Sequence, residues 1–147
     1  MIKRTLKHHG IPFLKYALVG VSGTILDVGL FTLLVAVTPL GETLLGHIIA
    51  ATITFTIAVS NNYFWNSRWT FKEHARRDKK QFFQFFLVSI IGWALNTFFL
   101  TVFSTLFIHL FSTLTPLLSA LAKICASGIV LIYNFLMNRF WTFKKRS

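Results

Sequence analysis

Side-chain amides recur in two short stretches, with the same spacing in each. Asn62 and Asn66 lie in "NNYFWNSRWTFK", and Asn134 and Asn138 lie in "YNFLMNRFWTFKK". Residues four apart share one face of a helix, so each stretch would present two amides in line. An Asn side chain offers two donors and an acceptor, which suits sugar hydroxyls, phosphate oxygens or neighbouring backbone. Each stretch is therefore a candidate binding site for a polar ligand.

Each pair of amides has an arginine beside it, Arg68 in the first stretch and Arg139 in the second. The planar guanidinium group binds phosphate with better geometry than the point charge of a lysine. Two such clusters facing each other at a membrane interface would form an anion-binding mouth. The alternative is structural: the amides join helices by hydrogen bonds, and the arginines and tryptophans form an interfacial belt.

Three further polar residues, Asp27, Asn96 and Lys123, interrupt long apolar segments. At ~1.5 Å per residue, Asp27 stands about 18 Å along a helix from Lys15. By the same measure, Lys123 stands about 24 Å from Arg139, at a similar depth. A charge at mid-membrane costs at least ~2.5 to 3.5 kcal/mol, so it usually pairs or lines a wet cavity. One possibility is that Asp27 and Lys123 form a structural ion pair. The other is that Lys123 meets a phosphate, while Asp27 holds Lys123 in place, releases Lys123 or contacts sugar hydroxyls.

The segments that carry these residues are apolar enough to cross a membrane. The chain of 147 residues is 54% hydrophobic and 13% charged, with a mean hydropathy of +0.64. A soluble domain of this size could not bury so much apolar surface. The sequence therefore predicts an all-α integral membrane protein with four transmembrane helices, each reaching the ~20 residues that a bilayer core requires. The predicted spans cover residues 12–37, 44–66, 82–108 and 116–138.

Lysines and arginines cluster at both ends of the chain and between the second and third spans. The other two connections, "TPLGETLLGH" and "HLFSTLTP", contain none. By the positive-inside rule, both termini and the basic loop 67–81 are expected in the cytoplasm. We expect these clusters to set topology and attract anionic lipids rather than bind nucleic acid. The clustered residues are Lys3, Arg4, Lys7, Lys15, Arg68, Lys72, Arg76, Arg77, Lys79, Lys80, Arg139, Lys144, Lys145 and Arg146.

The second half of the sequence repeats the first. Adding 72 to positions 62–72 gives six identities in eleven, and adding 69 carries Asp27 to Asn96. Because each half leaves the cytoplasm and returns to it, the two halves are predicted to be helical hairpins of the same orientation. We expect one membrane domain, 1–147, with repeats over about 13–72 and 82–145.

Both halves also carry small residues three positions apart in their first helix. These are Gly20 and Gly23 in the first half, and Ser89 and Gly92 in the second. Small residues allow the backbones of two helices to approach closely in a membrane. We therefore expect all four to lie at helix–helix contacts.

The chain resembles the GtrA-like family over about residues 13–145. The resemblance rests on "FLKYALVGVSGTILD", "NNYFWNSRWTFK" and "LAKICASGIVLIYNFLMNRFWTFKK", in which the paired N-x-x-x-N and W-T-F-K endings are distinctive. Members of this family are implicated in moving polyprenyl-phosphate-linked sugars across the bacterial inner membrane. Glycosyltransferases use these sugars on O-antigen, teichoic acid or other envelope polymers. The resemblance implies a similar lipid-linked sugar, such partner enzymes and a location in the bacterial inner (cytoplasmic) membrane.

The residues do not favour an enzyme, a metal site or a cofactor site. Of the four carboxylates in the chain, only Asp27 falls within a predicted span. The sequence contains neither a phosphate-cradling Gly-rich loop nor a nucleophile motif. His47 and His109 have no Cys, His or carboxylate at metal-ligand spacing. We therefore expect a protein that binds and moves its ligand without metal, cofactor or covalent chemistry.

The resemblance implies a translocase, or flippase, for a polyprenyl-phosphate-linked monosaccharide, and the polar residues described above would suit such a ligand. The headgroup would enter at the cytoplasmic mouth and pass along a polar seam of Asp27, Asn96 and Lys123, while the prenyl chain stays in lipid. One alternative is a non-transporting scaffold for a glycosyltransferase. Another is a small multidrug-type exporter, which would use Asp27 for a cation, although Lys123 and the arginines favour an anion. The small chain could act as a monomer or as a homodimer.

Overall fold

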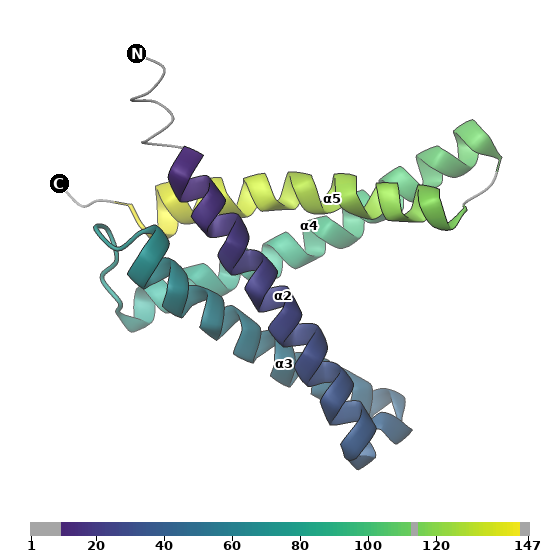
Figure 1. Cartoon of the computed structure of the whole chain (residues 1–147), viewed down its shortest axis with the longest axis horizontal. Coiled ribbons are helices and arrows are strands. Elements are labelled where there is room, and N and C mark those ends of the chain that lie inside the picture. Colours follow the sequence, from purple (N-terminus) through teal and green to yellow (C-terminus); the bar gives the residue numbers. More distant parts are fainter. Residues whose placement is uncertain (1–9, 113–114, 145–147) are drawn as a thin grey trace. The chain divides into compact units, whose positions relative to one another are not determined.

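The computed structural model describes residues 10–112 and 115–144. These residues form helices and no strand, with four long helices joined by short connections (Figure 1). The long helices are α2 (Ile11–Val37), α3 (Leu44–Trp65), α4 (Lys79–Phe111) and α5 (Pro116–Met137). A 3-10 turn, η2 (Pro39–Glu42), follows α2, and π-helical segments continue α3 and α5 as η3 (Asn66–Thr70) and η4 (Asn138–Thr142). Residues 1–9 and 145–147, which carry part of the predicted basic clusters, lie outside the described part.

Within the described residues, four helical segments are long and apolar enough to cross a membrane. They are Ile11–Val37, Leu44–Thr70, Lys79–Phe111 and Leu117–Thr142. This finding confirms the prediction of an all-helical, multi-pass membrane protein.

Some of these helices are longer than the predicted spans. The second continues through η3 to Thr70 instead of ending at Asn66, and α4 begins at Lys79 instead of Phe82. Consequently only residues 71–78 of the predicted loop 67–81 are non-helical. A helix can extend past the ~30 Å hydrocarbon core because polar and basic side chains at its end reach the headgroups.

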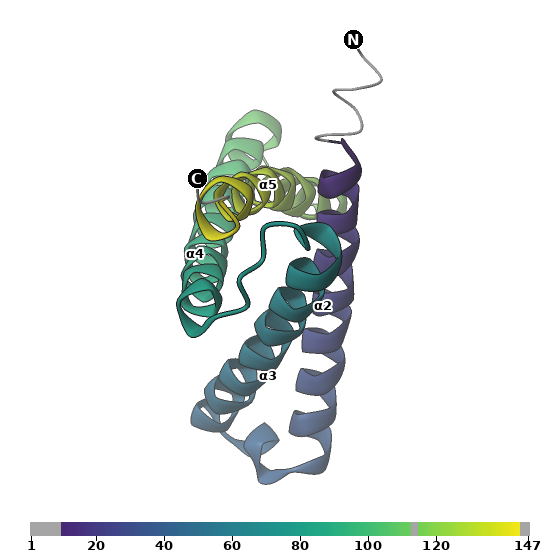
Figure 2. The same ribbon diagram turned by 90° about the vertical axis from the view of Figure 1, so that its left-hand side faces the viewer.

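The chain forms two compact units that divide between Asp78 and Lys79. In the first unit α2 packs against α3, and in the second α4 packs against α5 (Figures 1 and 2). Within each unit the chain turns at the far end of the first helix and returns beside it. Each unit therefore brings the start of its first helix near the end of its second.

Threonine caps set the start of the second helix in each unit. The Thr43 hydroxyl accepts a hydrogen bond from the Gly46 amide at 3.0 Å, and Thr115 accepts one from the Leu118 amide at 3.3 Å. A Thr at this position satisfies one of the free amides of the first turn. Pro116 follows Thr115, at a position where its fixed φ suits the helix and its missing N–H leaves no bond unmade.

Small side chains bring the helices of each unit together. The buried positions on the second helices recur every four residues, which gives one narrow, closely packed stripe. They are Ala50, Thr54 and Ala58 on α3, and Ala122, Ala126 and Val130 on α5. The facing positions are Tyr16, Val19 and Gly23 on α2, and Phe85, Val88 and Gly92 on α4. These stripes fix which side chains of each helix pair can meet.

Candidate functional site

In each unit an Asn amide lies directly against a glycine of the neighbouring helix. A Cβ atom at Gly23 would overlap the side-chain amide of Asn62, and a Cβ at Gly92 would overlap that of Asn134. Any other residue would displace the amide, so the glycine is what allows it to lie between the helices. By contrast, a Cβ at Gly20 would meet nothing within 4 Å. Within the first unit, Gly20 does not pack against α3, because it lies away from the stripe that faces α3.

The second amide of each pair is buried at the point where the helix becomes π-helical. Asn66 is 1% exposed and Asn138 is 0% exposed. The Asn138 amide nitrogen donates to the Asn134 carbonyl oxygen at 2.9 Å. The predicted pairs Asn62 with Asn66 and Asn134 with Asn138 lie one turn apart, from the end of α3 into η3 and from the end of α5 into η4.

The π-helical segments are features that the sequence analysis missed. The Phe71 amide donates to the Asn66 carbonyl oxygen at 2.8 Å, and the Phe143 amide donates to the Asn138 carbonyl oxygen at 2.7 Å. Both bonds reach five residues back instead of four. Short π-helical turns are rare and occur frequently at functional sites. Their presence at corresponding places in both units marks these helix ends as the candidate site.

Aromatic contacts hold both helix ends against the start of the first helix. The rings of Phe71 and Tyr16 are 6.1 Å apart, and those of Phe143 and Phe85 are 6.2 Å apart. Such distances are typical of aromatic pairs that contribute about 0.5–1.5 kcal/mol beyond their buried area. The phenylalanines of the two W-T-F-K endings thus have a packing role as well as any role in binding.

The two arginines of the predicted anion-binding mouth occupy non-equivalent positions. The repeat offset of 72 carries Arg68 to Phe140, and carries the buried Ser67 to Arg139. Arg68 is exposed, with its guanidinium 3.8 Å from the centre of the Phe64 ring. Arg139 is half-buried, 5.8 Å from the Phe135 ring. Both cations lie at the amide-bearing helix ends, but they leave their helices in different directions.

The intramembrane polar positions follow the glycines along the first helices. Asp27 lies one turn beyond Gly23 on α2, and Asn96 lies one turn beyond Gly92 on α4; both are half-buried. The Asn96 amide nitrogen donates to the Ser127 hydroxyl of α5 at 3.3 Å. Ser127 itself was not among the predicted site residues.

Lys123 lies on the exposed side of α5, one turn before Ser127. Residues four apart share a helix face, so Lys123 stands near the level of the Asn96–Ser127 hydrogen bond. Two of the predicted intramembrane residues, Asn96 and Lys123, thus come to one region of the second unit. Asp27 belongs to the first unit, so its pairing with Lys123 stays a prediction.

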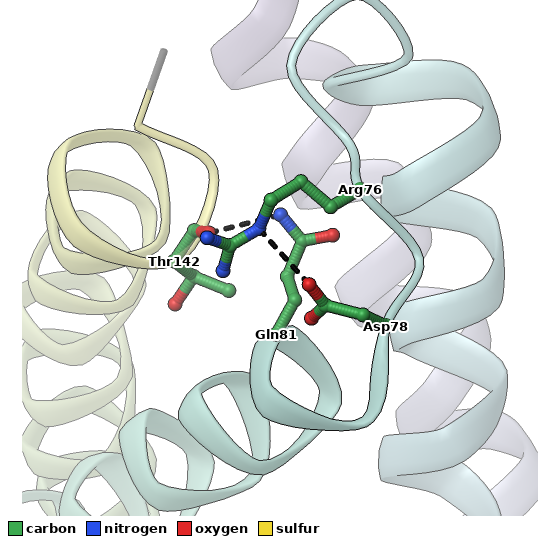
Figure 3. A network of polar contacts seen from close by, with 4 residues as sticks. All are labelled: Arg76, Asp78, Gln81 and Thr142. Atoms are coloured by element: carbon green, nitrogen blue, oxygen red, sulfur yellow. Dashed lines mark hydrogen bonds and ion pairs between the residues drawn. The ribbon is translucent and has the colours of Figure 1, made fainter. Parts of the chain in front are cut away.

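Side chains outside the amide pairs satisfy carbonyl oxygens at both helix ends. The Arg77 guanidinium donates to the Ser67 carbonyl at 3.4 Å, and the buried Gln81 donates to the Thr142 carbonyl at 3.0 Å. Figure 3 shows this Gln81 contact and, separately, the ion pair of Arg76 with Asp78 at 3.4 Å. These partners are not evident from sequence, because the acceptors are backbone atoms and carry no residue-type signal.

The chemistry of the assembled groups suits hydroxyl and phosphate ligands. Amides and hydroxyls lie along the helix contacts, and arginines lie at the helix ends. Within residues 10–112 and 115–144, no three His, Cys, Asp or Glu side chains come together to hold a metal ion. His47, considered above as a metal ligand, places Nδ1 2.9 Å from the Thr43 carbonyl oxygen.

Comparison with known proteins relates this arrangement to a family. The profile described as "GtrA/DPMS, transmembrane domain" matches residues 15–143, from the first turns of α2 to the end of η4. The chain is also 27% identical over 139 residues to "Uncharacterized membrane protein YngA" of Bacillus subtilis (strain 168), covering 95% of this chain and 84% of that protein. The profile match includes most of the first span, the other three spans and both amide pairs. This protein is therefore a membrane protein that belongs to the GtrA/DPMS transmembrane-domain family.

Proposed function

We propose that this protein is a translocase for a polyprenyl-phosphate-linked monosaccharide in the bacterial inner membrane. It would supply the sugar donor to glycosyltransferases that modify envelope polysaccharide or teichoic acid. Family membership supports this proposal in general terms. The observation that carries it is the line of polar side chains that crosses most of a membrane span in the second unit, together with a shorter line in the first.

In the second unit this line runs along α5 from Asn138 through Asn134 and Ser127 to Lys123. At 3.6 residues per turn the four side chains leave the helix within about 60° of one another. The 15 positions from Lys123 to Asn138 correspond to about 22 Å of helix, most of the ~30 Å hydrocarbon core. Asn96 of α4 joins the line through its bond to Ser127.

In the first unit the line is shorter and ends in a carboxylate. Asn66 and Asn62 follow α3, and Asp27 lies one turn beyond the glycine that Asn62 covers. Ala51 and Phe55 occupy the positions that correspond to Lys123 and Ser127. Within the spans, the positively charged Lys123 therefore belongs to the second unit and the negatively charged Asp27 to the first.

The cationic side chains would bind the phosphate of the headgroup, and the amides would bind its sugar. Arg68 and Arg139 would meet the phosphate at the interface, where a guanidinium can form two parallel hydrogen bonds to it. The amides would replace water around the sugar hydroxyls, and Lys123 would meet the phosphate deeper in the membrane. The prenyl chain needs no cavity because lipid solvates it, whereas the phosphosugar cannot cross hydrocarbon unaided. This mechanism requires binding and release only, without covalent catalysis.

The same proposal includes the orientation of the two units. We infer that they are hairpins related by duplication and inserted in the same direction, with both chain termini in the cytoplasm. The repeated Gly–Asn contacts and repeated π-helical ends support the duplication. The basic residues around η3 and the absence of Lys and Arg from the α2–α3 connection support the orientation.

Cysteine labelling tests this orientation directly. In a Cys125→Ser background, Glu42→Cys in η2 is expected to react with a membrane-impermeant maleimide added outside intact spheroplasts. Glu73→Cys, in the segment 71–78, is expected to react only after permeabilisation. Cys125 is the one cysteine of the chain, so its replacement leaves each new thiol alone. Labelling of Glu73→Cys in intact spheroplasts would contradict the proposed topology.

Reconstitution tests the proposed activity. Liposomes containing the purified protein and a fluorescent prenyl-phosphate sugar are expected to lose the sidedness of that lipid, as measured by a quencher added outside. A fluorescent phospholipid of equal chain length serves as the specificity control and should keep its sidedness. Equal movement of the lipid-linked sugar with and without protein would rule out translocation and leave a scaffold role for the glycosyltransferase.

A further inference from the structure

Several oxygen atoms at the amide-bearing helix ends are buried and accept no hydrogen bond. In the first unit they are Asn62 Oδ1, Asn66 Oδ1 and Thr70 Oγ1, for which the described part of the chain offers no partner. Asn134 Oδ1 and Thr142 Oγ1 are the corresponding atoms with this property in the second unit. Native structures leave few buried polar atoms unsatisfied, and each one points to a ligand, an ion, water or strain.

Other hydroxyl groups of the same helix do not share this feature. Thr52, Thr56 and Ser60 each donate to the carbonyl oxygen four residues earlier, at 2.8, 2.7 and 2.7 Å. This local bond is the usual way for a hydroxyl inside a membrane helix to be satisfied. Thr70 lies where the helix is π-helical, and its hydroxyl makes no such bond. The unsatisfied oxygens are therefore confined to the end of the helix and to one face of it.

These three oxygens form an acceptor ladder, a name we use for Asn62 Oδ1, Asn66 Oδ1 and Thr70 Oγ1. Their residues are four apart, so each oxygen lies about one turn from the next. The Asn62 amide is confined by Gly23, and Asn66 is 1% exposed, so neither can swing out to water. The ladder also lies at the C-terminal end of a long helix, where the helix dipole places partial negative charge.

We propose that the acceptor ladder binds a monovalent alkali cation, which bridges neighbouring oxygens while water completes its shell. Neutral carbonyl and hydroxyl oxygens are the ligands that replace the hydration of such ions in membrane proteins. Calcium and magnesium sites usually include carboxylates, and the ladder has none. The described residues also hold no group of three His, Cys, Asp or Glu for a transition metal.

The basic side chains nearby are engaged elsewhere and leave the ladder to a small ion. Arg77 donates to the Ser67 carbonyl oxygen at 3.4 Å. Arg68 lies 3.8 Å from the centre of the Phe64 ring, and the Lys15 ammonium lies 5.2 Å from that of Trp69.

Tryptophan fluorescence of the full chain in detergent micelles can detect this binding without any lipid-linked sugar. Trp65 and Trp69 flank the ladder, and replacement of Trp93 and Trp141 by Phe leaves these two of the four tryptophans. Titration with NaCl or KCl, with choline chloride keeping ionic strength constant, is expected to give a saturable change for at least one of the two ions. An identical signal in all three salts would overturn the proposal and leave ordered water as the partner of these oxygens.

Substitutions in the acceptor ladder are expected to raise or lower the affinity for the cation in defined directions. Asn66→Asp places a full negative charge in the ladder. It is expected to lower the dissociation constant about fivefold or more, the effect of one unit charge near 4 Å even at the dielectric constant of water. Thr70→Val keeps the shape but removes one ligand and is expected to weaken binding. Asn66→Leu is expected to abolish the response.

Asn61→Leu is the matched control, because Asn61 adjoins Asn62 but has no part in the ladder, and it should leave the titration unchanged.

At a cation concentration about ten times its dissociation constant, the folding equilibrium constant is expected to rise about elevenfold. An unchanged titration in both Thr70→Val and Asn66→Asp would overturn the assignment. The inference does not depend on the proposed translocase, since no test uses substrate.

Discussion

Replacement of Lys123 by Gln is expected to reduce translocation of the lipid-linked sugar about 10- to 100-fold, as for loss of one hydrogen bond to a charged group. Lys123 is the one cation in α5, and it stands one turn from the Asn96–Ser127 hydrogen bond. Gln keeps much of the length and polarity of the side chain but cannot offset phosphate charge inside the membrane. The liposome assay measures the rate, and the amount of protein recovered in the liposomes is measured in parallel.

Two further variants separate charge from position. Lys80→Gln removes an exposed lysine near the start of α4 and is the matched control, with translocation expected near the original rate. Lys123→Arg keeps the charge and is expected to keep more activity than Lys123→Gln. If Lys80→Gln lowers the rate as much as Lys123→Gln does, the effect reflects total charge and not a contact with the headgroup.

Substitution of Asp27 tests whether this carboxylate is the partner of Lys123. Asp27→Ala is expected to abolish translocation, because the carboxylate either holds Lys123 or contacts the sugar. If the exchange of Asp27→Lys with Lys123→Asp restored full activity, the two residues would form a structural ion pair. The assignment of Lys123 to the phosphate would then be wrong.

The sequence was sufficient to predict the spans and the paired amides, because both depend on periodic patterns. Twenty or more apolar residues make a span, and Asn residues four apart share a helix face wherever the helix lies. Arg68 and Arg139 were predicted to lie beside the two amide pairs, but they do not occupy equivalent positions of the repeat. Their offset of 71, against 72 for the amides, turns one guanidinium by about 100° relative to the other.

The parts of the site that the sequence could not reveal depend on backbone atoms or on exact helix approach. Gln81 and Thr142 are 61 residues apart, and their bond uses a carbonyl oxygen that every residue possesses. The π-helical ends arise from a shift of one residue in the hydrogen-bonding pattern, which no residue type specifies. Similarly, Gly20 and Gly23 are identical as residues, and only the position of α3 decides which one meets a neighbour.

Gly23→Ala is expected to destabilise the first unit by about 1–3 kcal/mol, the usual cost of forcing an extra methyl group into a packed contact. The new Cβ would occupy the space of the Asn62 amide, so α2 and α3 would have to separate or Asn62 would have to leave. Gly92→Ala is expected to act in the same way through Asn134 in the second unit. The midpoint of unfolding by added SDS, followed by circular dichroism of the protein in detergent, measures both effects.

The chain provides a matched control for this experiment in Gly20, three residues from Gly23 on the same helix. A Cβ there meets nothing within 4 Å, so Gly20→Ala is expected to be neutral or to stabilise α2 by about 0.5–1 kcal/mol through its higher helix propensity. If Gly20→Ala raises the stability and Gly23→Ala lowers it, the loss at Gly23 comes from packing and not from helix propensity.

A double-mutant cycle with Asn62 then identifies the contact itself. Asn62→Ala removes the amide that the new methyl group would strike, so it should relieve much of the cost of Gly23→Ala, with a coupling of about 0.5–3 kcal/mol. Simple addition of the two single effects would show that the amide does not lie on Gly23. In that case the amide would be free to leave the helix contact, and neither the proposed polar path nor the acceptor ladder would have a fixed oxygen at this position. The cycle therefore tests the one contact on which both proposals depend in the first unit.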